Sequence, residues 1–271
     1  MRQRPEVQTI NANPCSTWRT LALQHVQNLP IEVFDQITSD LNVREAWWLT
    51  QTIGIPSRFH YAIGRRIRLA LHHFFTDIGS VYRSVESSGA CITGNIVLRM
   101  LVGGHWEEND LDLIVSNTHW EYVLNLLRKE GYELEPPNDT LAGYEPVEQK
   151  MFVQGDKTVM VNIFDPTQTT QEGVAAGQTF TAMMSTLTST GFIIPFPELT
   201  FACTGAIRDD AIGDADVVCA VAGRLASVGI EPLMIANRVI STRELQRVSR
   251  GATTLLEQKT CWCVEWKPRS S

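Results

Sequence analysis

The chain has 271 residues, of which 44% are hydrophobic and 20% charged, so it can bury a sizeable core and should fold. Its net charge of −7 argues against general nucleic-acid binding, because neutralising phosphates needs a cationic surface. The start, Met1–Pro5, leads into no apolar signal segment, and no apolar run reaches the length of a membrane span.

The first part of the chain predicts a polar start followed by short helices. We expect residues 1–27 to be mobile, with Trp18–Val26 as one candidate helix. Residues 28–75 then predict three helices, at Pro30–Leu41, Val43–Thr52 and Phe59–Phe75. Helices this short cannot bury much core alone, so they must pack on another part of the molecule.

An apolar stripe follows the first of these helices at four-residue spacing, and its members are Leu29, Val33, Ile37 and Leu41. The simplest interpretation is an amphipathic helix packed on the larger domain. Alternatively, a short peripheral helix with one apolar face suits recognition by a partner groove.

These residues, with Pro30 after Leu29 and Trp47-Trp48-Leu49 in the next helix, resemble the F-box over about forty residues. The resemblance implies that Leu29, Pro30, Val33, Ile37 and Leu41 contact the adaptor subunit of a cullin–RING ubiquitin ligase. The second helix departs from the family pattern, since Thr50–Gly54 replaces its usual basic end.

Residues 76–271 change to an alternation of strands and helices, which predicts a mixed α/β sheet. The expected elements are strands at Ala90–Thr93 and Leu111–Val115, helices at Ile96–Leu101 and Trp120–Glu130, and a hairpin of Met151–Val153 with Thr158–Phe164 around Gly155-Asp156. From about Asp214 we expect two helices and a last strand, Thr260–Trp266.

Two acidic residues stand close together at the start of the second strand. Asp110 and Asp112 are two apart, so on a strand they point to one face about 7 Å apart along the chain. Paired carboxylates of this kind suit Mg²⁺, which prefers oxygen ligands. Upstream, Gly94-Asn95 lies at a strand-to-helix turn, where backbone N–H groups can approach a phosphate. This pattern predicts a site for Mg²⁺ and a nucleoside triphosphate (NTP).

Gly94-Asn95 followed by Asp110-x-Asp112 resembles the nucleotidyltransferase superfamily over roughly Ser84–Phe164. More specifically, Trp106-x-x-x-Asp110, Thr186 and Phe196-Pro197-x-Leu199-Thr200 resemble a group of fungal nucleotidyltransferase-like proteins. The resemblance implies a nucleotidyltransferase-like fold, and Thr186 as a residue lining the site. A core-facing hydroxyl at Thr186 is the alternative.

Active members of that superfamily place a third carboxylate on a later strand, where it completes the metal site. The matching strand here contains Asn162, which is neutral and cannot accept a proton as a general base. Asp165 should face the other side, and Glu107 or Glu108 could substitute only if their loop folds over the site. We therefore expect a domain that binds a nucleotide or serves as a scaffold, with an active metal-dependent nucleotidyltransferase as the alternative.

Other side chains indicate packing or solvated surface. The six cysteines should stay reduced in the absence of secretion, which favours the cytosol or the nucleus. A local basic patch could arise from Arg58, Arg65, Arg66 and Arg68, although a solvated helix face is the simpler interpretation.

Overall fold

The computed structural model describes residues 24–103, 108–136, 148–165 and 181–206, together with 219, 222–223, 226 and 231–233. The helices are α2 (Ile31–Ser39), α3 (Val43–Thr52), α4 (Pro56–His72), α5 (Ile78–Ser88), α6 (Asn95–Val102), α7 (Trp120–Lys129), the 3₁₀ turn η2 (Thr181–Met184) and α9 (Pro197–Phe201). The strands are β1 (Cys91–Thr93), β2 (Asp110–Ser116), β3 (Glu133–Leu134), β4 (Glu148–Gln154), β5 (Lys157–Phe164), β6 (Thr186–Thr188), β7 (Gly191–Ile193), β8 (Thr204–Ala206) and β9 (Glu231–Leu233).

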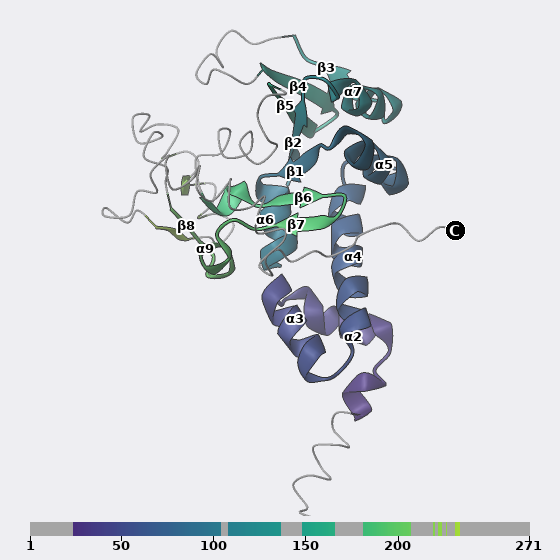
Figure 1. Cartoon of the computed structure of the whole chain (residues 1–271), viewed down its shortest axis with the longest axis vertical. Helices are drawn as coiled ribbons and strands as arrows, with labels where there is room; N and C mark the ends of the chain where they lie inside the picture. The colour runs from purple at the N-terminus through teal and green to yellow at the C-terminus, as the bar shows by residue number, and fades with distance from the viewer. Residues whose placement is uncertain are drawn as a thin grey trace, which may run out of the picture.

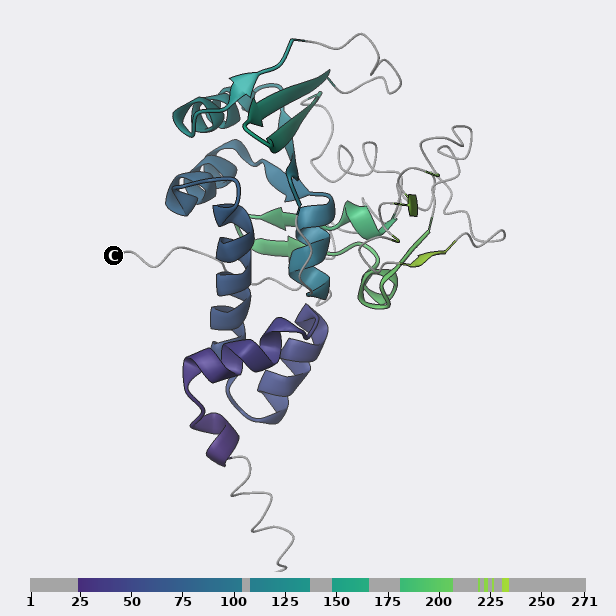
Figure 2. The same ribbon diagram turned by 180° about the vertical axis from the view of Figure 1, so that it is seen from behind.

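Seven of these strands form one mixed sheet in the order β3-β4-β5-β2-β1-β6-β7, while β8 and β9 pair separately. Within the large sheet, β2 and β5 run parallel and the other neighbours run antiparallel. The connection between β2 and β5 contains α7, as a parallel crossover requires. Figures 1 and 2 show β3, β4 and α7 at one end of the molecule, and α2 and α3 at the opposite end. The predicted mixed α/β sheet is confirmed.

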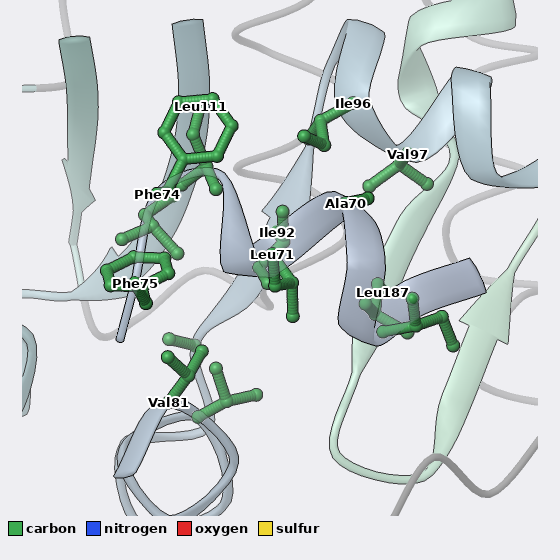
Figure 3. Packing of buried hydrophobic residues seen from close by; sticks show 14 of the residues in the cluster. Ala70, Leu71, Phe74, Phe75, Val81, Ile92, Ile96, Val97, Leu111 and Leu187 are labelled. Atoms are coloured by element: carbon green, nitrogen blue, oxygen red, sulfur yellow. The ribbon is translucent and has the colours of Figure 1, made fainter. Parts of the chain in front are cut away.

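One face of the sheet is the main core. On β2, Leu111, Leu113 and Val115 are buried and alternate with the two aspartates, because successive side chains of a strand point to opposite faces. Leu113 is opposite Ile92 of β1 and Val161 of β5, so all three strands present apolar side chains to the same side. The end of α4 and the residues just after it cover this face, as Figure 3 shows for Leu71 and Phe74.

The predicted elements agree with the structure except at several boundaries. Pro30 precedes α2 as its N-cap rather than lying in its first turn, and α4 spans Pro56–His72. Helix α5 was not predicted; its start is stabilised by the Asp77 carboxylate, which accepts a hydrogen bond from the Ser80 N–H, and Gly89 ends it with φ of 63°. The predicted helices from Asp214 lie largely outside the described residues, and the strand Thr260–Trp266 lies wholly outside them.

The N-terminal helices share the core of the sheet. Val43 and Ala46 of α3 and Ile63 and Ile67 of α4 belong to the same buried cluster as the strands. A polar contact reinforces the packing, since Arg66 of α4 donates hydrogen bonds to the carbonyl oxygens of Thr38, Leu41 and Met100. The division of the chain at residues 75 and 76 stays a prediction, and the core runs continuously across it.

Among the described residues, none of the helices combines the length and the hydropathy that crossing a bilayer requires.

Candidate functional site

The two aspartates lie on the face of the sheet opposite the main core. Asp110 and Asp112 are partly exposed at the first and third positions of β2, and their neighbours Leu111 and Leu113 are buried. Parallel pairing places Thr158 beside Asp110 and Met160 beside Asp112. We call this side of the sheet the acidic face; it holds the predicted metal ligands.

A glycine turn brings backbone against the second aspartate. Gly94 has φ of 78° and ψ of −156°, a conformation that residues with a Cβ rarely adopt. A Cβ added at Gly94 would overlap the carboxylate of Asp112. The antiparallel pairing of Thr93 with Asp112 sets this close approach, so glycine is needed for both its conformation and its small size.

Helix α6 begins at this turn. Gly94 is its N-cap and Asn95 its first residue, so the N–H groups of its first turn, which have no partner within the helix, lie beside the acidic face. A carboxylate near a helix N-terminus is electrostatically favoured, which suits the position of Asp112. The Asn95 side chain is buried, and its Oδ1 accepts no hydrogen bond from any described residue. The turn thus combines the N-terminus of a helix with a buried amide oxygen that has no partner among the described residues.

Asn162 lies on the acidic face, two residue pairs further along the β2–β5 ladder than Asp112. It is opposite Ile114 in the parallel ladder, whereas Met160 is opposite Asp112. Its Oδ1 accepts a hydrogen bond of 2.8 Å from Nε2 of Gln149 on β4, the strand on its other side. Neither β1 nor β5, the two strands that border β2, contains a carboxylate.

Thr186 reaches the same face from β6. Its neighbour Leu187 pairs with Ile92, so alternation along the strand puts Thr186 on the side of Thr93. Thr93 itself is fully buried, and its hydroxyl lies 2.9 Å from the Met183 carbonyl oxygen and 3.1 Å from that of Ser185. The Thr93 hydroxyl thus connects β1 to the segment that leads into β6. Sequence reasoning missed this connection; the only signal was a threonine directly before the glycine turn.

A small apolar cluster closes the far end of the acidic face, and it consists of Cys91, Ile114, Phe164 and Met184. Burial raises the pKa of the Cys91 thiol to about 12, so it stays protonated at neutral pH. A protonated, buried thiol is a packing group rather than a nucleophile.

The other residues that the sequence predicted for the metal site and for partner binding lie in different environments. Asp165 follows β5 and is exposed. Glu108 has a buried side chain, while Glu107 and Trp106 lie outside the described residues. On the N-terminal stripe, Val33 and Ile37 are 40% and 46% exposed, Pro30 is exposed, and Leu29 and Leu41 are partly buried.

Two carboxylates on one strand face fit a single divalent cation. They supply the hard oxygen ligands that Mg²⁺ takes, and Mg²⁺ commonly binds through one or two carboxylates with water and phosphate completing its shell. Across the described residues, no group of three or more His, Cys, Asp or Glu side chains lies close enough together to hold a metal. Within the part of the chain that the structure describes, the acidic face therefore has a pair of carboxylates and not the three of a two-metal centre.

The sequence matches no protein-family model and no curated protein. Several solved structures resemble the fold, among them the following three. A tRNA-processing enzyme in its apo form I has a TM-score of 0.42 and 16% identity, over 66% of this chain and 46% of its own. A CCA-adding enzyme, apo form I, has a TM-score of 0.43 and 13% identity, over 66% and 44%. The Thermotoga maritima CCA-adding enzyme complexed with tRNA has a TM-score of 0.41 and 13% identity, over 68% and 43%.

The chain thus spans less than half the length of these three structures. Because each TM-score lies below 0.5, the candidate site is defined by the topology and side chains described above.

Gly94→Ala tests the glycine turn. The added methyl group meets the Asp112 carboxylate and forces an unfavourable backbone conformation, which should lower the free energy of unfolding by about 1–3 kcal/mol. Urea denaturation measures this change. Gly89→Ala is the matched control, because Gly89 also has positive φ but a Cβ there meets no atom within 4 Å. Equal stability of the two variants would show that Gly94 does not press against Asp112.

Proposed function

We propose that the chain is a nucleotidyltransferase-like protein that binds an NTP with one divalent cation and has lost efficient transfer. The observation that carries the proposal is the contact of the Gly94 backbone with the Asp112 carboxylate at the start of α6. This contact brings a phosphate-binding feature and a metal ligand to one point on the acidic face.

The cation follows from electrostatics. A triphosphate on the Gly94 turn would lie beside Asp112 and close to Asp110, and like charges at such distances repel. A Mg²⁺ ion held by both carboxylates would neutralise that repulsion and polarise the phosphate oxygens. The Asn95 side chain, on the same turn, offers an amide that can donate to a phosphate oxygen. We therefore expect nucleotide binding to require the divalent cation.

The loss of transfer follows from the neighbours of the aspartates. Transfer needs a group that removes the proton from the attacking hydroxyl, and further negative charge to hold a second metal. On the acidic face of β5, Thr158 and Met160 lie beside Asp110 and Asp112, and Asn162 lies beside Ile114; none of the three is a carboxylate. The hydrogen bond from Gln149 also engages the Asn162 oxygen. Two carboxylates are then enough to bind the cation and the NTP, but they do not support efficient nucleotidyl transfer.

Thermal denaturation with each NTP, with and without Mg²⁺ or Mn²⁺, tests the binding. A ligand at a hundredfold excess over its Kd adds about 2.7 kcal/mol of stability, so the melting temperature should rise clearly when cation and nucleotide are both present. Asp110→Ala and Asp112→Ala should abolish the rise. The matched control is Asp156→Ala, which removes an exposed charge in the β4–β5 turn and should leave the rise intact. An unchanged melting temperature with all nucleotides would contradict the proposal.

The alternative is an active metal-dependent nucleotidyltransferase that moves a nucleoside monophosphate from an NTP to a hydroxyl or protein acceptor. The carboxylate pair on β2, which the site shares with such enzymes, favours it. The two readings differ in whether the wild-type chain transfers label from an α-labelled NTP in the presence of Mg²⁺ or Mn²⁺.

Asn162→Asp separates these readings. If the missing carboxylate limits transfer, this variant should incorporate label at least about a hundredfold faster than the wild type, the usual contribution of a positioned base. Met160→Asp is a useful comparison, since it puts the carboxylate directly beside Asp112. If the wild type transfers label as fast as Asn162→Asp, and Asp112→Ala abolishes that transfer, the chain is an active enzyme.

We also propose that α2 docks on the adaptor subunit of a cullin–RING ubiquitin ligase, as the F-box resemblance implies. The supporting observation is the exposure of Val33 and Ile37, while Phe34 and Thr38 of the same helix face inward and are buried. Trp48 of α3 is 62% exposed, a large apolar surface near the same end of the molecule. Apolar side chains left outside the core are available to a partner groove.

Titration calorimetry with the purified adaptor subunit tests this docking. Wild-type protein should bind, and the double variant Val33→Glu/Ile37→Glu should bind at least about tenfold more weakly, because it puts charge into an apolar contact. Gln36→Glu adds one charge at an exposed position of the same helix and should bind like the wild type. Absence of binding by the wild type, or equal binding by the double variant, would refute the docking role.

A further inference from the structure

A cavity of about 130 Å³ lies between α2, α4 and α6. Its walls include Ser39 of α2, Arg65, Arg66 and Leu69 of α4, and Arg99 of α6. We call it the arginine cavity. Arg99 lies toward the C-terminal end of α6, while the Gly94 turn precedes the N-terminal end, so the cavity is distinct from the acidic face.

Three guanidinium groups line the cavity and differ in how they are partnered. Arg65 forms an ion pair with Asp35, the only carboxylate in the cavity wall. Arg66 donates to the carbonyl oxygens of Thr38, Leu41 and Met100, which are neutral acceptors. The Arg99 backbone carbonyl accepts from the Gly103 N–H, but its guanidinium makes no hydrogen bond or ion pair with any described residue. Its donors are therefore available to a ligand.

The local charge favours an anion. Burial lowers the pKa of Arg66 to about 10, with Asp35 and Asp40 acting in the opposite direction, so the group is still charged at neutral pH. Counting Asp40 as well as Asp35, three cations face two carboxylates and the cavity keeps a net positive charge. The chain as a whole carries −7, so this positive site is opposite in sign to the rest of the molecule.

We propose that the arginine cavity binds a phosphate group, with Arg99 as the principal ligand and Arg65 and Arg66 contributing charge. A guanidinium presents its N–H groups in a planar fork that matches two oxygens of a phosphate. The space is adequate, since one water needs only roughly 10–15 Å³ of cavity volume. The hydroxyl groups of Thr38 and Ser39 donate to backbone carbonyl oxygens of α2, so the arginines are the donors that face the anion.

Thermal denaturation and titration calorimetry with inorganic phosphate, against chloride at equal ionic strength, test the site. The wild type should show a saturable rise in melting temperature, and Arg99→Gln should weaken phosphate binding by at least about tenfold. Arg99→Lys keeps the charge but loses the fork, and should fall between them. The control Arg128→Gln removes an exposed arginine on α7 and should bind like the wild type. Glycerol 3-phosphate in a parallel titration shows whether a phosphomonoester is accepted as well as the free ion.

Ser39→Glu provides a second variant that removes no hydrogen bond from the arginines, and it should weaken phosphate binding by placing a carboxylate at the cavity wall. Phosphate could also reach the Gly94 turn, but binding there would not respond to Arg99. A rise in melting temperature that persists in Arg99→Gln and Ser39→Glu would therefore overturn the proposal, as would a wild type that does not distinguish phosphate from chloride.

Discussion

The candidate site depends on the pairing of two short strands. Because Thr93 is opposite Asp112, the chain leaves β1 directly alongside a carboxylate, and only a residue without a Cβ fits at position 94. That one contact determines where α6 starts, where the N–H groups of its first turn lie, and which aspartate is next to them. A shift of the register by one residue would point the aspartates into the core and the leucines out of it.

The two faces of the sheet differ in composition and burial. The face with Leu113 and Val161 buries apolar side chains against the helices and supplies most of the core. The acidic face keeps Asp110 and Asp112 partly exposed and has a small buried apolar cluster around Ile114 and Phe164. Folding free energy is thus gained mainly on one side, while the other side keeps two carboxylates partly exposed to solvent.

The N-terminal helices are joined to this sheet by packing and by hydrogen bonds. Arg66 connects the C-terminal end of α2 to α6, and Gly103 allows α6 to end against the carbonyl oxygens of Ser39 and Leu41, where a Cβ would come within 3.2 Å. Helix α6 therefore has the Gly94 turn before one end and the arginine cavity near the other. Val33 and Ile37 remain on the outer side of α2, so this helix has an exposed apolar surface on one side and a buried contact with the core on the other.

The sequence by itself determined the alternation of strands and helices, the hairpin around Gly155, and the placement of Asp110 and Asp112 on one side of a strand, because period-two and four-residue spacings are local properties. Only the tertiary structure decided which residues of β5 accompany the aspartates: Met160 lies beside Asp112, and Asn162 is two residue pairs further along and hydrogen-bonded to Gln149. The tertiary structure alone revealed the hydrogen bond of the Thr93 hydroxyl to the Met183 carbonyl oxygen, the outward orientation of Val33 and Ile37, and the arginine cavity. Strand register and helix docking depend on contacts between residues far apart in the chain, and local spacing contains no information about those distances.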